Sequence, residues 1–426
     1  MGNAIAKKLI SYLILSTIFI MGKPIVEIGF YLYWYHIVYI LFAIYFILIF
    51  HSIEKKILTF ILILIVYSLL TYQYSVGLVL KQLINLTFVI FISYGFIRHE
   101  KFDFYEIFRK YTVCCKVVLV IGFIQVLLFT LRLESLYFAV LPYLKVTNIN
   151  ARMQSVTLEP SFLSYTFVPV LFISLYNLFN NQALFFSKKW SIAFVIGYVL
   201  TFSAIGYVSF IMILLLLYFQ NFTLRKLSYV FFVFFGISVL AYVAYQNLEE
   251  IKRRVDDTYF GVTEGIIANE GYTKVNLSTY GLLSNGYVTK RSLEEQPLTG
   301  AGLGNYSIIY DRYLPSRLKE YYELSREEAS SLALRLLGET GLIGFLMFCF
   351  FILKFRIKSN SLFSQEEKFL WLFNSSIFVL AIVLLLRSGD YSANGRILFF
   401  LIYYYTYCQI KNSREEFQVS SALTYR

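Results

Sequence analysis

A short stretch of the chain combines a basic and an acidic residue at the entrance to an apolar segment. In ARMQSVTLEPSF, Arg152 is followed by Glu159, Pro160 and Ser161, and a run of mostly apolar residues begins directly after them. If Pro160 ends the preceding chain and Ser161 is the helix N-cap, the helix dipole favours the carboxylate of Glu159. An acidic and a basic residue therefore meet the membrane surface together, which makes Glu159 and Arg152 candidates for chemistry. The alternative is a helix entry with an ordinary interfacial ion pair, because charges at membrane interfaces are common.

Arginines form the second group of candidates. A guanidinium group stays protonated at working pH and presents five donors in one plane, which suits it to phosphate or pyrophosphate. Arg387 and Arg396 flank a short loop at the rim of apolar segments, where an unpaired guanidinium costs a few kcal/mol, and Asp390 is the available partner. The remaining candidates are Arg253, Arg254, Arg291, Arg312, Arg317, Arg326 and Arg335, and acidic neighbours can pair with several of them, such as Asp256, Asp257, Glu294 and Glu295.

Other motifs favour neither a cofactor nor a metal. The stretch LTGAGLGNY at residues 298–306 looks like a dinucleotide fingerprint, but no strand–helix–strand pattern surrounds it, and a tight glycine turn is the better interpretation. The four cysteines have no spacing typical of metal ligands. The three histidines lie in or near apolar segments or on the side predicted below to face the cytoplasm: His36, His51 and His99. We therefore expect no metal site and no cofactor.

These candidates must be positioned by long apolar segments, because 58% of the 426 residues are hydrophobic and only 15% are charged. A soluble domain has about 25% charged residues. The apolar blocks run to roughly 17–24 residues, the length of a helix that crosses a hydrocarbon core of about 30 Å. They are continuous rather than alternating, which disfavours a transmembrane β-barrel. The sequence therefore predicts an all-α polytopic membrane protein with about twelve transmembrane helices.

The predicted helices fall into two groups separated by a hydrophilic stretch. Residues 1–246 form a membrane domain of about nine helices, at 9–22, 31–50, 57–73, 76–97, 112–131, 161–179, 189–204, 206–221 and 227–246. A large loop follows over residues 247–331. Residues 332–411 complete the membrane domain with about three helices, at 332–355, 369–387 and 395–411, and residues 412–426 form a tail.

Alternate loops between the predicted helices are rich in Lys and Arg, which indicates the side of the membrane that they face. By the positive-inside rule these loops are cytoplasmic, and so are both termini, which agrees with an even number of helices. These clusters account for the net charge of +12, so nucleic acid is not an expected partner. Residues 132–160 and the large loop then lie in the periplasm, where ATP and nucleotide sugars are absent.

The large loop carries structural signals of its own. An amphipathic, charged stretch begins it at residues 248–257, the dipeptide Asn285-Gly286 predicts a turn, and Pro297 and Pro315 are predicted breakers. At this length the loop is more than a connector. We expect a structured loop whose first part acts as a lid.

Taken in order, four motifs resemble the O-antigen polymerase (Wzy-type) branch of the O-antigen ligase and polymerase superfamily. They are Arg152 through TLEPSF, residues 203–207 (SAIGY), GAGLGNY and RLLGETGLIGF, and the resemblance covers nearly the whole chain. In that family, Glu339, Gly341 and Gly344 belong to the motif that closes the large loop onto the tenth helix. The ligase branch is expected to carry a histidine just before that helix, where this chain has SREEASSLALRLLGE, which favours a polymerase.

The resemblance implies an enzyme of the bacterial inner membrane that polymerises oligosaccharide repeat units carried on undecaprenyl pyrophosphate. The growing chain moves from its lipid onto the free end of a new unit, which builds O-antigen or a related polysaccharide. Because the pyrophosphate already activates the donor, no cofactor is needed. The implied catalytic residues are Glu159, as general base, and Arg152, and the implied ligands of pyrophosphate or sugar are Arg291, Arg312, Arg387, Arg396 and Tyr207.

Two other functions stay open on the sequence alone. An O-antigen ligase transfers finished polymer to the lipid A core, and a flippase moves lipid-linked repeats across the membrane without catalysis. The expected partners are the lipid-linked oligosaccharide and the lipid bilayer, with a regulator of chain length as a further candidate.

Overall fold

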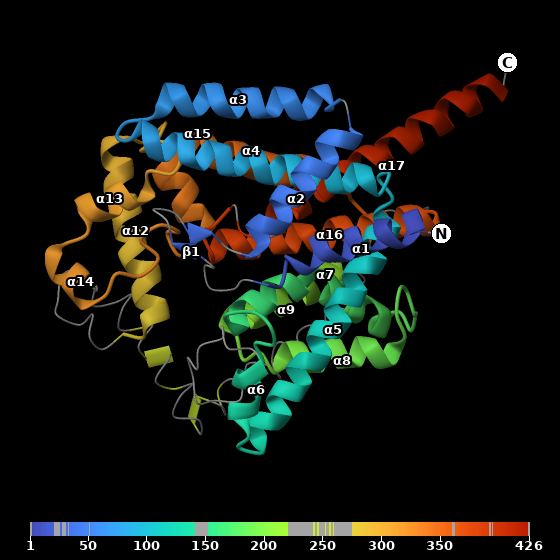
Figure 1. The fold of residues 1–426 in the computed structure, drawn as a ribbon, viewed down its shortest axis with the longest axis horizontal. Helices are drawn as coiled ribbons and strands as arrows, with labels where there is room; N and C mark the ends of the chain where they lie inside the picture. The colour runs from blue at the N-terminus through green and yellow to red at the C-terminus, as the bar shows by residue number, and fades with distance from the viewer. Residues whose placement is uncertain are drawn as a thin grey trace.

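The computed structural model is almost wholly helical (Figure 1). It describes residues 2–20, 26–27, 31–32, 34–50, 52–140, 152–219, 275–359, 363–391, 393 and 395–424, with isolated positions between 242 and 259. Within these ranges the strands are β1 (Val26–Glu27) and β2 (Tyr31–Leu32), which pair antiparallel with Val26 opposite Leu32. Apart from this short hairpin, the predicted all-α architecture is confirmed for the described part of the chain.

In the described part of the first half, helices overlap the first eight predicted spans, although the first helix runs from Gly2 to Ser16 rather than over the predicted 9–22. They are α1 (Gly2–Ser16), α2 (Trp34–Ile49), α3 (Lys55–Thr71), α4 (Val76–His99), α5 (Phe104–Thr130), α6 (Glu134–Val140), α7 (Pro160–Phe179), α8 (Lys188–Val199) and α9 (Ala204–Phe219). Of these, α6 has no counterpart among the predicted helices. The predicted helix at 227–246 and the amphipathic stretch at 248–257 lie outside the described residues, apart from isolated positions.

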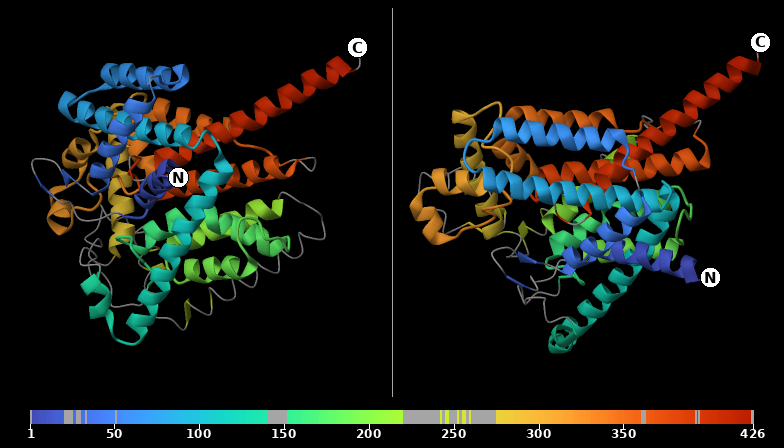
Figure 2. Two further views of the ribbon diagram at one scale, coloured as in Figure 1. Left: turned by 45° about the vertical axis from the view of Figure 1, so that its right-hand side comes forward. Right: turned by 45° about the horizontal axis from the view of Figure 1, so that its top comes forward.

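In the described part of the second half, three helices lie where the large loop is predicted and three more follow it. They are α12 (Leu277–Glu295), α13 (Tyr306–Tyr313), α14 (Ser316–Tyr321), α15 (Leu332–Lys354), α16 (Gln365–Leu386) and α17 (Arg396–Thr424). Most of the predicted tail is therefore a continuation of α17, which projects beyond the other helices (Figures 1 and 2).

Five of the described helices are long and apolar enough to cross a membrane, namely α4, α5, α7, α15 and α16. Two more, α2 and α9, are apolar but shorter. The chain therefore has the character of a membrane protein with several spanning helices. The count of twelve and the orientation in the membrane stay predictions.

Polar side chains determine where several long helices begin. Ser75 Oγ accepts a hydrogen bond from the backbone N–H of Leu78 at 3.3 Å at the start of α4. Asp103 Oδ1 accepts from Glu106 N at 2.9 Å, so α5 begins well before residue 112, where apolarity alone places it. These bonds satisfy N–H groups that have no partner within the helix.

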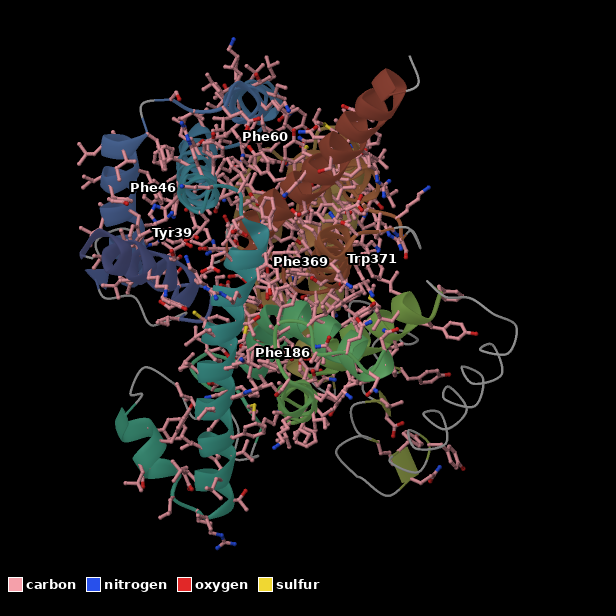
Figure 3. The ribbon with its side chains drawn as sticks, turned by 90° about the vertical axis from the view of Figure 1, so that its right-hand side faces the viewer. Tyr39, Phe46, Phe60, Phe186, Phe369 and Trp371 are labelled. Carbon is pink, nitrogen blue, oxygen red and sulfur yellow. The ribbon has the colours of Figure 1, made fainter. Side chains whose placement is uncertain are left out.

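The helices pack around α7 and α16, whose residues are mostly buried. Phe369 and Trp371 of α16 lie in this core together with Phe186, from the turn before α8, whereas Phe60 of α3 lies at the periphery and is exposed (Figure 3). Many other apolar side chains of α3 are exposed as well. Because lipid tails are as apolar as these side chains, such a surface is suited to face lipid.

Residues 275–331, called the cap here, surround a second and smaller core at one end of the bundle. Its buried side chains include Tyr280, Val288, Tyr306, Tyr310 and Leu318, from all three cap helices. Both chain termini lie at the opposite end (Figure 1). The cap is thus a folded unit, as the structural signals in this part of the sequence predict.

The predicted turn at Asn285-Gly286 is wrong, because both residues lie inside α12. The Asn285 side chain is buried, and its Nδ2 donates to the carbonyl oxygens of Gly281 at 2.7 Å and Leu324 at 3.1 Å. The bond within α12 to Gly281 and the tertiary bond to Leu324 together override a turn preference that rests on two residues. The predicted breakers are confirmed, since Pro297 follows the end of α12 and Pro315 is the N-cap residue of α14.

Candidate functional site

The helix α15 is interrupted at Gly341, where φ is 61° and ψ is −162°. The interruption frees two carbonyl groups before the break and two N–H groups after it, which would bond to each other in a continuous helix. Residues 297–302 supply all four partners: Ala301 N donates to Gly338 O (2.9 Å), Gly302 N to Glu339 O (2.8 Å), Leu342 N to Pro297 O (2.9 Å) and Ile343 N to Leu298 O (3.1 Å). The two glycine-containing motifs GAGLGNY and RLLGETGLIGF therefore bond to each other.

This contact requires glycine. Gly300 has a φ of 65°, and its predicted role in a tight turn is confirmed. A Cβ on Gly341 would lie 2.4 Å from the backbone of Leu298, and one on Gly300 would lie 2.6 Å from the backbone of Gly341. The close approach at Gly341 fixes the cap against α15, within two turns of Arg335.

A buried ion pair lies directly before the break. Arg335 Nε is 3.0 Å from Glu339 Oε1, and their side chains are 8% and 0% exposed. The hydroxyl of Tyr391 donates to Glu339 Oε2, and Arg335 Cζ lies 4.0 Å from the centre of the Tyr391 ring. Burial raises the pKa of Tyr391 well above its ordinary value, so this hydroxyl keeps its proton and stays a donor. A buried pair with this many partners compensates both charges.

A second buried arginine, Arg396, lies beside this pair at the start of α17. Its Nη2 donates to Ser388 Oγ at 2.5 Å, and Ser388 also hydrogen bonds to Tyr165 of α7. Asp390 lies 3.7 Å from Nη1 of Arg335 and attracts Arg396 as well. The term arginine site is used here for a set of seven residues: Arg335, Arg396, Asp390, Ser388, Tyr165, Glu339 and Tyr391. The site joins α7, α15, the loop after α16 and α17.

Glu328 of the cap borders the arginine site. Its side chain meets solvent, yet protein surrounds much of it, and Asp390, Arg396 and Arg335 are close enough to influence its charge. Desolvation by the surrounding protein, followed by the carboxylate of Asp390, raises the pKa of Glu328 to about 7. A carboxyl group with this pKa can accept and release a proton near neutral pH.

Glu159 lies at the edge of the arginine site. The start of the helix that follows it differs from the prediction. It is the N-cap residue of α7, and Pro160 is the first helical residue, so the prediction of Ser161 as N-cap is wrong. Proline suits that position because it has no N–H to leave unpaired. The exposed carboxylate accepts from Ser161 Oγ at 3.0 Å and acts electrostatically on Tyr165.

Arg152 lies at the turn between α8 and α9. Its Nη2 donates to Phe202 O at 2.9 Å and its Nε to Thr201 O at 3.3 Å. Gln125 of α5 orders the residues that follow, because its Oε1 accepts from Gln154 N at 3.0 Å. Tyr207, also predicted to bind substrate, is half-exposed and lies near enough to Arg152 to feel its charge.

Three of the other predicted arginines bind protein groups on or near the cap, namely Arg387, Arg291 and Arg312, whereas Arg253 and Arg254 lie outside the described residues. Arg387 joins the loop after α16 to the cap, since its Nη1 donates to Ser278 O at 3.0 Å and its Nη2 to Ser278 Oγ at 2.9 Å. Two more form exposed ion pairs on the cap surface, which confirms that acidic neighbours pair with several arginines: Arg291 with Glu294 (2.9 Å) and Arg312 with Glu295 (3.0 Å).

The motif analysis gives no role to Glu328, Tyr165 and Tyr391, and assigns Arg335 no partner. One signal was available, because Arg335 and Glu339 are four residues apart in an otherwise apolar helix and so must face each other. For Glu328 no local pattern exists, since its environment depends on the loop after α16.

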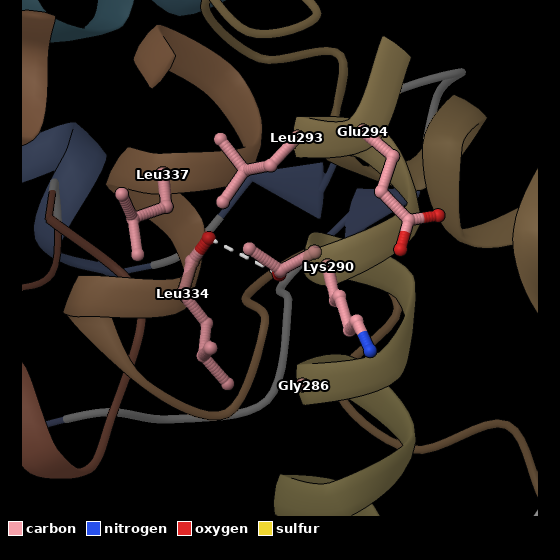
Figure 4. A pocket seen from close by; sticks show the side chains of 7 residues that line it. Gly286, Lys290, Leu293, Glu294, Leu334 and Leu337 are labelled. Carbon is pink, nitrogen blue, oxygen red and sulfur yellow. Dashed lines mark hydrogen bonds between the residues drawn. The ribbon is translucent and has the colours of Figure 1, made fainter. Parts of the chain in front are cut away.

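A groove lies between α12 and α15 (Figure 4). One wall carries Leu334 and Leu337, on the same turns of α15 as Arg335, and Leu334 O accepts from Thr289 Oγ1 of α12 at 3.3 Å. The other lining residues come from α12: Gly286, Thr289, Lys290, Leu293 and Glu294.

Neither a family model nor a curated protein matches this chain. Within the described ranges, no three His, Cys, Asp or Glu side chains are grouped so that they could hold a metal ion. The arginine site itself offers guanidinium groups that can bind an anion and carboxylates that can accept a proton.

Proposed function

We propose that this chain is a membrane glycosyltransferase that polymerises lipid-linked oligosaccharide repeat units at the periplasmic face of the bacterial inner membrane. The observation that carries the proposal is the arginine site, in which Arg335 and Arg396 are buried among carboxylates at the ends of apolar helices. Ionisable groups in such a position are costly and typically mark a substrate site or path.

The reaction suits these groups. The acceptor hydroxyl attacks the anomeric carbon of the donor sugar, the bond from that carbon to pyrophosphate breaks, and the lipid pyrophosphate leaves with the electron pair. Arg396 stabilises the negative charge on the leaving oxygen, and a carboxylate takes the proton of the hydroxyl. The donor is already activated, so these two tasks and the orientation of the acceptor are sufficient.

The places of the motifs in the fold support the same proposal. The two glycine-containing motifs that resemble the polymerase family hold Arg335 in place, and Glu159 of the TLEPSF motif borders the same site. Under this proposal the cap and Glu159 face the periplasm, both termini are cytoplasmic, about twelve helices span the membrane, and the lipid-linked repeat unit is the partner.

A deletion strain tests the function and separates it from its alternatives. Loss of a polymerase leaves surface lipopolysaccharide that carries a single repeat unit, which a gel of surface glycan resolves. Loss of a ligase leaves lipopolysaccharide without any repeat, and loss of a flippase leaves repeats on the cytoplasmic face. Either of these last two patterns would contradict the proposed polymerase.

The role of Arg396 is tested by complementing that strain with Arg396→Ala. We expect polymer to fall by about 100-fold or more, as when a group that stabilises the transition state is removed. Arg396→Lys keeps the charge but loses the planar donors, so we expect partial activity. The measurement is the polymer ladder on a gel, normalised to the amount of protein in the membrane.

Arg109→Ala is the matched control, because Arg109 is 56% exposed and bonds only to Glu106 among the interactions described for it. Its polymer ladder should equal that of the wild type. A full ladder from Arg396→Ala would show that Arg396 does not bind the leaving group.

A further inference from the structure

The segment that carries Glu328 is held rigidly against the loop after α16. Ser388 N donates to Ser330 O at 2.7 Å, and Ser331 Oγ donates to Leu385 O at 2.6 Å. Gly389 approaches the carbonyl of Glu328 so closely that no other residue fits there. Cap and loop therefore hold Glu328 in a defined position before any substrate binds.

The groups that face Glu328 come from every segment packed against it. Asp390 of the loop after α16 and Glu327 of its own segment oppose ionisation of its carboxyl group, whereas Arg335 of α15 and Arg396 of α17 favour it. Glu328 is exposed, so a hydroxyl group can reach it, and its neighbour Arg396 is the group assigned to the leaving pyrophosphate.

We propose that Glu328 is the catalytic base that removes the proton from the acceptor hydroxyl in the glycosyl transfer described above, on which this inference rests. The hydroxyl oxygen forms a bond to the anomeric carbon as its proton passes to a carboxylate oxygen of Glu328. The bond between the anomeric carbon and the pyrophosphate oxygen breaks, and the electron pair leaves with the lipid pyrophosphate. The proton then returns to solvent.

The other carboxylates at the site are less suited to this role. Glu339 is fully buried and bonded to both Arg335 and Tyr391, and Asp390 is engaged by Arg335. Glu159, the base predicted from the sequence, accepts a hydrogen bond from Ser161 at the start of α7. Glu328 combines solvent access with a pKa of about 7, which suits a base that works near neutral pH.

The experiment uses membranes of the deletion strain, which supply its own unpolymerised lipid-linked repeat units. Wild-type chain, Glu328→Gln, Glu159→Gln and Glu327→Gln are added in detergent, and the rate of elongation is measured from pH 5 to pH 9. Glu327→Gln is the matched control, because Glu327 is the exposed neighbour of Glu328 in the same segment.

We expect the wild-type rate to rise about tenfold per pH unit below pH 7 and to level off above it, because only the ionised base accepts a proton. Glu328→Gln should be slower by about 100-fold or more and should lose this pH dependence. Glu328→Asp should recover part of the rate. Glu327→Gln should keep the maximal wild-type rate and a pH-dependent profile. The midpoint of that profile should move slightly toward lower pH, because the carboxylate of Glu327 no longer opposes ionisation of Glu328. Glu159→Gln should keep the wild-type pH profile, whatever its rate.

Three results would count against the proposal. A wild-type rate in Glu328→Gln, or a pH profile unchanged by that substitution, would overturn the role of Glu328 and leave the polymerase intact. Loss of the pH dependence in Glu159→Gln alone would assign the base to Glu159. If the wild-type chain itself does not elongate the repeats, the proposed function and this role are overturned together.

Discussion

At the scale of single residues, the arginine site depends on the compensation of buried charge. Arg335 and Glu339 compensate each other's charge. Tyr391 adds a hydrogen bond to Glu339, and Asp390 adds a second carboxylate near Arg335. Removing one partner of a buried pair leaves an uncompensated charge, which costs roughly 3–5 kcal/mol. Replacing both partners with apolar residues avoids that cost.

Glu339→Gln should therefore destabilise the protein by roughly 3–5 kcal/mol, because Arg335 loses its only fully buried counter-charge among the described residues. The double variant Arg335→Met with Glu339→Leu should recover much of the stability while remaining unable to polymerise. Thermal unfolding of the detergent-purified protein measures the first effect, and the surface-glycan gel measures the second. A double variant that is stable and active would mean that the pair has no part in function.

Chemical reasoning from the sequence identifies the arginines at the rim of the apolar helices but not which carboxylate stands beside them. Arg396 is recognisable because a guanidinium next to an apolar run needs a partner or a ligand. Glu328 is the last of four successive polar or charged residues in SREEAS, and nothing in that stretch distinguishes it from Glu327. The difference arises from Asp390 and Arg396, which are far away in sequence.

At the scale of helices, apolar length predicts the position of a segment but not its internal geometry. α15 lies where the sequence places a helix at 332–355, yet its interruption at Gly341 depends on backbone groups of residues 297–302. Glycine in both motifs is visible in the sequence, whereas the pairing between them is not. A chain break of this kind is tolerated in an apolar helix only where other backbone groups replace the lost hydrogen bonds.

Gly341→Ala tests this contact. The left-handed backbone alone should cost roughly 1–3 kcal/mol, and the collision of the new Cβ with Leu298 adds to it. We expect lower thermal stability and a loss of polymer, since Arg335 and Glu339 lie directly before the break. The measurements are thermal unfolding in detergent and the surface-glycan gel.

Gly286→Ala provides the comparison, because Gly286 lies inside α12 with no atom within 4 Å of the added Cβ. Alanine favours a helix interior over glycine by about 0.5–1 kcal/mol, so this variant should be slightly more stable. Equal stability of the two alanine variants would argue against the role of Gly341 in joining the cap to α15.

At the scale of the whole molecule, the cap and the two termini lie at opposite ends of the helical bundle (Figure 1). The positive-inside rule predicts the same separation from charge alone, with the cap outside and the termini inside. Charge patterns can predict which side of the membrane a loop faces, because the Lys and Arg content of each loop is read from that loop alone. They cannot predict that cap helices form their own core, which depends on contacts among Tyr280, Tyr306 and Leu318.

Single cysteines test the orientation. Ser316→Cys, exposed on α14 of the cap, should react in intact cells with a maleimide that crosses the outer membrane but not the inner membrane. Lys358→Cys, exposed after α15 at the other end, should react only after the inner membrane is opened. The wild-type chain, with its four native cysteines, gives the background. The reverse labelling pattern would place the arginine site in the cytoplasm and rule out a periplasmic polymerase.

The hydrogen bonds between residues 297–302 and α15 also bear on how the protein is made. These residues precede α15 in the chain, so they leave the ribosome before the interrupted helix does. When α15 enters the bilayer, the donors and acceptors for its freed backbone groups have already been synthesised. No backbone N–H or C=O group of the break therefore has to remain unpaired in the hydrocarbon core. The order of translation thus delivers each partner ahead of the group that requires it.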